Sequence, residues 1–218
     1  MWEVGLKSDL LDNRLRLNLA YFHNEIDDIQ RELNLPDFID PVGGVVVLQG
    51  TVNAGDVTIK GVELEFTAVP TDQFTIYGSV GYLDGRYTSK NPLYDIGPPL
   101  GIGDDLPRLA PWSYSIGAGY DFILGNNGIL NLQADYGYRD RNAYNDANTE
   151  FFDEQRRLGA SVNWISPEDH WRVSLFGKNL KDQANYGNLT VIPAPDRTYT
   201  SGPMQRGREY GMELQYRL

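Results

Sequence analysis

The sequence predicts an all-β protein, an antiparallel, up-and-down transmembrane β-barrel segment of about nine strands. Three observations predict it. Apolar and polar residues alternate with period two in many short segments, the links between segments are short and long in turn, and aromatic residues lie near segment ends on the apolar side. Strands with this alternation expose one face to an apolar medium and the other to water.

Alternating segments occur along the whole chain. Trp2, Val4 and Leu6 alternate with polar or small residues, and Leu11-Asp12-Asn13 is typical of a turn. A second segment runs from Leu15 to Tyr21 and completes a hairpin. Later strands are expected at 57–67, 74–82, 112–122, 130–139, 158–164, 171–175 and 208–218.

The links between these segments differ in length. Four irregular stretches rich in Pro, Gly or acidic residues are expected to be loops: 27–56, 88–107, 142–153 and 185–207. A short strand at 45–48 is possible within the first of them. Short turns are expected at 70–72 and 167–169, and at Gly125 to Gly128, where a positive φ is required. In outer-membrane barrels tight turns lie on the periplasmic rim and long loops on the external rim, so the alternation favours a barrel over a soluble sandwich.

Composition agrees with this interpretation. Aromatic residues make up 12% of the chain, and those expected near strand ends suit a membrane interface. They are Tyr21, Tyr82, Trp112, Tyr136, Tyr138, Trp164, Trp171, Tyr210 and Tyr216. The net charge of -11 argues against nucleic acid as a partner. No apolar run is long enough for a transmembrane helix, and a mean hydropathy of -0.43 is compatible with barrel strands.

The last eleven residues, Arg208 to Leu218, alternate to the end of the chain. This ending resembles the terminal strand of bacterial outer-membrane barrels, which the barrel-assembly machinery reads. The predicted assembly signal consists of Tyr210, Met212, Leu214, Tyr216 and Leu218.

Five segments in order resemble the C-terminal half of the TonB-dependent receptors of Gram-negative outer membranes. They are 2–30, 53–66, 106–115, 176–186 and the terminal strand. The resemblance implies a barrel of about 22 strands closed by an N-terminal plug domain. Residues 1–218 would be the C-terminal part of that barrel, with the plug absent, and would form an open, curved sheet when isolated. The terminal strand would then lie at the edge of this sheet and pair only with the segment from Trp171 to Tyr186. The chain ends in Leu218, where the family usually ends in Phe.

The resemblance also implies function and partners. Such receptors actively take up scarce nutrients across the cell outer membrane, most often ferric siderophores. The expected partners are outer-membrane lipid, the assembly machinery, a small-molecule ligand and, only through the missing plug, the TonB complex. Two alternatives remain open: a small stand-alone outer-membrane pore and a soluble β-sandwich binding module.

Catalytic chemistry is not indicated. The two histidines, His23 and His170, lie far apart in the sequence, and no hydrolase, metalloprotease or phosphate-loop motif occurs. The acidic stretch from Asn145 to Glu150 lacks the ordered spacing of a calcium loop. We expect neither an enzyme nor a cofactor or metal site.

A ligand would meet the external loops and the lumen residues just below them. Cations for an anionic chelate and aromatic rings for stacking are the useful side chains there. The candidates are Arg86, Arg139, Arg141, Arg197, Tyr87, Tyr94, Tyr144 and Phe151. The competing interpretation for each arginine is a lumen charge paired with a neighbouring Asp or Glu.

Overall fold

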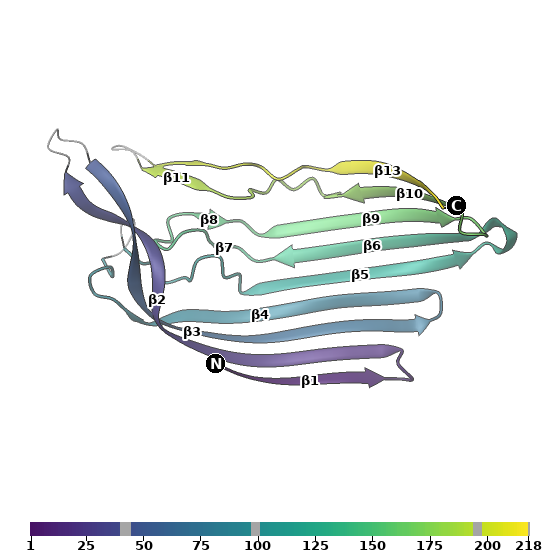
Figure 1. The fold of residues 1–218 in the computed structure, drawn as a ribbon, viewed down its shortest axis with the longest axis horizontal. Helices are drawn as coiled ribbons and strands as arrows, with labels where there is room; N and C mark the ends of the chain where they lie inside the picture. Colours follow the sequence, from purple (N-terminus) through teal and green to yellow (C-terminus); the bar gives the residue numbers. More distant parts are fainter. Residues whose placement is uncertain (40–44, 97–100, 194–197, 218) are drawn as a thin grey trace.

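The computed structural model describes residues 1–39, 45–96, 101–193 and 198–217. Within them nine strands form one antiparallel sheet in the order β1-β2-β3-β4-β5-β6-β9-β10-β13 (Figure 1). The strands are β1 (Trp2–Leu10), β2 (Leu15–Ile39), β3 (Val45–Thr71), β4 (Phe74–Lys90), β5 (Trp112–Ile123), β6 (Ile129–Arg139), β9 (Gln155–Ile165), β10 (Trp171–Lys178) and β13 (Glu209–Tyr216). This confirms the predicted fold class, because a sandwich would need two packed sheets.

The sheet is an up-and-down meander in which each strand pairs with the neighbours that precede and follow it in the sheet order. The short turns after β1, β3, β5 and β9 lie at one end, the turn end, and the long links after β4, β6 and β10 lie at the other, the loop end, where the β2–β3 hairpin also projects (Figure 1). The predicted segregation of links is therefore confirmed. No helix in the described ranges is long and apolar enough to cross a membrane.

The predicted turn at 125–128 is also confirmed. It contains the 3-10 turn η1 (Gly125–Asn127), with φ of 60° at Gly125 and 88° at Gly128. A Cβ atom at Gly128 would lie 2.0 Å from the carbonyl oxygen of Ile165. Glycine is therefore required at position 128 both for its backbone angle and for this close approach.

The predicted loop at 27–56 is wrong. β2 and β3 continue through this stretch and form a long hairpin beyond the sheet, with the 45–48 strand as the start of β3. Register shifts between Ile26 and Gln30 and between Leu35 and Phe38 bend it, and Figure 1 shows it crossing the loop end of the other strands. Backbone pairing satisfies the peptide groups whatever the side-chain pattern, so strands can persist where alternation ends.

Three other predicted loops contain more structure than expected. β4 extends to Lys90, three residues into the stretch predicted to be irregular. The 142–153 link holds a small hairpin of β7 (Asn142–Ala143) and β8 (Phe151–Phe152). The 185–207 link holds another, β11 (Thr190–Pro193) and β12 (Thr198–Ser201). Strands of two to four residues are too short to show periodicity in a sequence.

The apolar face of the sheet is exposed and has an aromatic belt at each end. Exposed aliphatic residues lie between the belts, for example Leu175, Met212 and Leu214, with exposed fractions of 52%, 71% and 62%. The belt toward the loop end contains Trp2, Tyr21, Tyr82, Trp112, Tyr114, Tyr138 and Tyr210, and the belt toward the turn end contains Phe74, Tyr120, Phe122, Trp171 and Tyr216. Cross-strand ring pairs hold the belts together, such as Tyr82 with Trp112 at 4.7 Å. This is the surface pattern of a transmembrane barrel wall.

The two outer strands of the sheet are open edges. β1 pairs with β2, and β13 pairs with β10 between Trp171 and Lys178. No β1 to β13 pairing closes the sheet among the described residues. The prediction of an open sheet with the terminal strand at its edge is confirmed.

Candidate functional site

The polar face of the sheet corresponds to the lumen side of a barrel, and hydrogen bonds between polar side chains run across its strands. Asn163 donates to Asn131 at 3.0 Å, and Asn131 donates to Asp121 at 2.6 Å. The hydroxyls of Ser79 and Ser115 lie 2.9 Å apart. These contacts make a polar wall on which a ligand site can form near the loop end.

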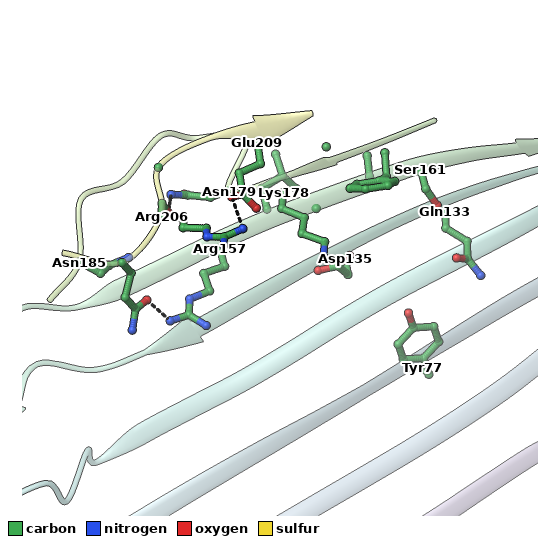
Figure 2. Close-up of a pocket in the computed structure, with 17 residues that line it drawn as sticks. Tyr77, Gln133, Asp135, Arg157, Ser161, Lys178, Asn179, Asn185, Arg206 and Glu209 are labelled. Atoms are coloured by element: carbon green, nitrogen blue, oxygen red, sulfur yellow. Dashed lines mark hydrogen bonds and ion pairs between the residues drawn. The ribbon is translucent and has the colours of Figure 1, made fainter. Parts of the chain in front are cut away.

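One cavity of about 540 Å³, here called the mixed cavity, lies on this wall (Figure 2). Arg157 and Lys178 project into it from β9 and β10, and Asp135 projects from β6 (Figure 2). Arg206 contributes a third cation but pairs with Glu209 at 3.2 Å. The mixed cavity therefore contains charges of both signs.

A second cavity of about 470 Å³, here called the arginine cavity, shares Arg157 and Gln205 with the first. Three of its eleven lining residues are arginines: Arg108, Arg139 and Arg157. Its described lining contains no aspartate or glutamate. Phe152 and Tyr186 add aromatic surface. The two cavities together form a trough at the loop end of the wall.

The three guanidinium groups bond to neutral acceptors. Arg139 donates to the carbonyl of Arg108 at 3.0 Å, and Arg108 donates to the side-chain oxygen of Asn188 at 3.3 Å. Arg157 donates to the side-chain oxygens of Gln155 and Gln205. These acceptors orient the guanidinium groups without neutralising their charge.

Strand register places two of these arginines. Arg157 lies opposite Gly137, and Arg139 lies opposite Gln155, so both point to the lumen side at the end of the β6 and β9 pair. Arg108 comes from the 91–111 link, where its φ of 63° and a bond from its N–H to the carbonyl of Ala143 set the local turn.

Above the wall, the outer segments are held together by a small buried core. Leu33, Ala54 and Ile102 are 4%, 0% and 1% exposed. Beside this core Arg31 and Asp146 form an ion pair of 3.2 Å, with side chains 24% and 16% exposed. This pair, here called the outer clasp, joins the β2–β3 hairpin to the 142–153 link.

Two of the predicted ligand residues lie at or next to the trough. Arg139 lines the arginine cavity. Tyr144 lies behind it, with the Arg108 guanidinium 5.2 Å from its ring and its hydroxyl donating to Asn188 at 3.1 Å. Arg141 and Phe151 stack on each other at 3.6 Å but line a different, smaller cavity together with Asp84 and Asp105.

The remaining predicted residues lie elsewhere. Tyr87 and Tyr94 pack against the outer core. Arg86 is exposed on β4, where its backbone pairs with that of Asp105. Arg197 lies outside the described residues.

The predicted assembly residues form an exposed row on β13. Tyr210, Met212, Leu214 and Tyr216 are all more than half exposed. Leu218 lies outside the described residues. The row belongs to the apolar face, as the alternation predicted.

Sequence reasoning missed Arg108 and Arg157. Arg157 lies on the same face of β9 as Gly159, Ser161 and Asn163, so the alternation of this strand could have predicted that its side chain points to the lumen. Arg108 lies in a link without periodicity, and only the folded chain brings it to the cavity.

Metal binding has no support in the described ranges, where no group of three His, Asp or Glu side chains could hold an ion. The oxygens of the 145–150 stretch serve structural bonds instead. The side-chain oxygen of Asn145 accepts the N–H of Thr149 at 3.1 Å, and that of Asn148 accepts the N–H of Asp105 at 2.8 Å.

An open meander with aromatic belts on one face and a polar wall on the other defines a segment of a transmembrane β-barrel. The family model described as TonB dependent receptor-like, beta-barrel matches residues 1–180. The chain therefore belongs to that family.

Solved structures with the same fold include the ferric yersiniabactin uptake receptor FyuA from Yersinia pestis, at 17% identity over 98% of this chain and 29% of that one, with a TM-score of 0.76. The siderophore receptor PiuA from Acinetobacter baumannii matches at 20% identity over 98% and 28%, with a TM-score of 0.69. The FrpB iron transporter from Neisseria meningitidis matches at 18% identity over 98% and 30%, with a TM-score of 0.61. This chain thus spans less than a third of each matched structure.

Proposed function

We propose that residues 1–218 form the C-terminal part of the barrel of an outer-membrane receptor that takes up a scarce nutrient actively, and that this nutrient is a ferric siderophore. The observation that carries the proposal is the trough, which lies on the lumen wall at its loop end. A ligand arriving from outside the cell would meet this part of a receptor barrel first. Family membership over residues 1–180 supports a transport receptor rather than an enzyme.

Each face of the sheet has its own proposed partner. The exposed apolar face, with its two belts, contacts outer-membrane lipid, and the β13 row is the surface for the barrel-assembly machinery. Contact with the TonB complex belongs to a plug domain outside residues 1–218.

Cell fractionation tests the proposed location. The chain is expressed behind an export signal in a Gram-negative host, and we expect it in the outer-membrane fraction. Recovery as a folded, soluble periplasmic monomer would contradict the proposal.

An uptake assay tests the proposed activity. Residues 1–218 replace the equivalent barrel strands of a siderophore receptor, and radiolabelled iron is supplied as a panel of chelates to an iron-starved host lacking its own receptors. We expect energy-dependent uptake of at least one chelate. A correctly inserted chimera that imports none would contradict the siderophore proposal.

A further inference from the structure

The arginine cavity is positively charged although the chain as a whole is acidic. The protein has 30 acidic and 19 basic residues and a net charge of -11, yet the described lining of this cavity has three arginines and no carboxylate. The neighbouring mixed cavity, on the same wall, contains Asp135 and Glu209 beside its cations. The excess of positive charge is therefore local to the arginine cavity.

The arginines are not paired with carboxylates among the described residues. Their hydrogen-bond acceptors are the Arg108 carbonyl and the amide oxygens of Asn188, Gln155 and Gln205. Three like charges around one cavity repel each other, and an anion placed between them would remove that repulsion. Each guanidinium also has five N–H donors, so donors remain for a ligand after these contacts.

Guanidinium groups recognise carboxylates and phosphates through two parallel hydrogen bonds. Arg139 and Arg157 lie on the rigid β6 and β9 pair, while Arg108 approaches from a link and Phe152 and Tyr186 provide flat apolar surface. The geometry points to a site for a polyanion, a ligand with two or more carboxylate or phosphate groups. This inference rests on the proposed uptake function and narrows its ligand to an anionic chelate; a neutral chelate would find no counter-charge here.

Direct binding to the full chain, inserted in the outer membrane and extracted in detergent, tests the inference by calorimetry. The probes are ferric citrate, pyrophosphate and a ferric trihydroxamate of zero net charge. We expect the polyanions to bind more tightly than the neutral chelate and their affinity to fall as salt is added. Comparing citrate with pyrophosphate distinguishes carboxylate from phosphate as the preferred group.

Two variants remove one guanidinium each, Arg139→Gln and Arg157→Gln. Loss of one charge-assisted contact should weaken polyanion binding by about tenfold or more. The matched control is Arg156→Gln. Arg156 directly precedes Arg157 on β9, but its side chain belongs to the opposite face and pairs with Glu154 at 2.7 Å. The affinity of the Arg156→Gln variant for the polyanions should equal that of the wild type.

Gln205→Glu tests the charge without removing an arginine. The new carboxylate would accept the bond that Arg157 now gives to the Gln205 amide and would neutralise part of the cavity. We expect weaker polyanion binding in a variant of nearly unchanged shape. Equal affinity of the polyanions in wild type, Arg139→Gln and Gln205→Glu would overturn the inference, as would tighter binding of the neutral chelate.

The uptake assay and the binding assay can contradict the proposed function and the polyanion site independently of each other. A chimera that imports only neutral chelates retains the uptake function but overturns the polyanion site. A chain that binds polyanions with the expected variant pattern, in a receptor that imports no iron chelate, retains the site but contradicts the siderophore proposal.

Discussion

At the scale of single residues, the two glycines of the turn between β5 and β6 differ in why glycine is needed. Gly128 has a steric requirement that Gly125 does not have. Both have positive φ, 88° and 60°. A Cβ at Gly128 would meet the Ile165 carbonyl at 2.0 Å, whereas nothing lies within 4 Å of a Cβ at Gly125. The turn between β5 and β6 therefore has space for a side chain at Gly125, where only the positive φ limits the choice of residue, and has no space for one at Gly128.

We expect Gly128→Ala to destabilise the protein by about 1–3 kcal/mol, because backbone strain and a clash with backbone act together. Gly125→Asn is the control, and it should cost less than about 0.5 kcal/mol because Asn tolerates the left-handed region. Unfolding in detergent, followed by tryptophan fluorescence, measures both. Equal losses would show that the close approach to Ile165 is unimportant.

Asp146 is a second residue whose environment has a measurable consequence. Burial raises the pKa of Asp146 above its ordinary value of 3.8, and the Arg31 guanidinium opposes this shift. A carboxyl with a higher pKa in the folded state stabilises the fold below its unfolded pKa, and that stabilisation is lost as the pH rises through its folded pKa.

The outer hairpin should therefore open more readily as the pH rises from below 3.8 through the raised pKa of Asp146. Asp146→Asn cannot ionise and should remove this dependence. Hydrogen exchange of the backbone amides of 29–33 and 50–54, corrected for intrinsic exchange rates, measures the opening. An unchanged pH dependence in the variant would assign it to other groups.

At the scale of elements, the outer clasp connects two segments that have no shared β-ladder. Its side chains are mostly buried beside the core of Leu33, Ala54 and Ile102. A buried ion pair adds little net stability because desolvation offsets attraction, but removing one partner leaves the other charge buried without compensation.

Arg31→Met should lower the free energy of local opening of the β2–β3 hairpin by about 2 kcal/mol. The double variant Arg31→Met with Asp146→Leu should recover most of this loss, since neither charge remains. Limited proteolysis and hydrogen exchange of the hairpin report the opening. Arg16→Met, which breaks an exposed pair with Asp9, is the control and should have little effect. Additive losses in the double variant would refute the coupling.

β10 shows the contrast between the two faces within one strand. Leu175 is 52% exposed and lies opposite Val162 and Met212 on the apolar face, while Ser174 is on the polar face. An arginine placed in the middle of the apolar band should cost about 2–4 kcal/mol, and one facing the lumen should cost much less. Stability in lipid bilayers should therefore fall in Leu175→Arg and not in Ser174→Arg. The reverse order would mean that the faces are assigned wrongly.

At the scale of the whole molecule, the sheet has two open edges. The free backbone groups of β1 and β13 would each cost several kcal/mol if left unpaired in hydrocarbon. Closing the wall requires further strands or a second sheet edge.

We therefore expect the 218-residue chain alone in detergent to associate through these edges. Light scattering coupled to size-exclusion chromatography measures the mass. A stable monomer that conducts ions in bilayers would instead favour a small stand-alone pore closed by β1 and β13.

Much of the fold could be predicted from period-two alternation and link length. The nine strands and the apolar row from Tyr210 to Tyr216 follow from local sequence, whereas the open edge at β13 was predicted from the family resemblance. The β2–β3 hairpin could not be predicted in the same way, because between 27 and 56 the strands are held by backbone ladders across bulges rather than by a side-chain pattern.

The candidate site could likewise be predicted only in part from the sequence. By itself the sequence determined which strand residues face the lumen, because successive side chains of a strand point to opposite faces of the sheet. The lumen position of Arg139 could therefore be predicted from the alternation. Only the tertiary structure decided that Arg108 joins Arg139 and Arg157 around one cavity, and that Arg141 and Phe151 lie in another. Links have no period to read, so the positions of their side chains depend on contacts between segments far apart in the chain.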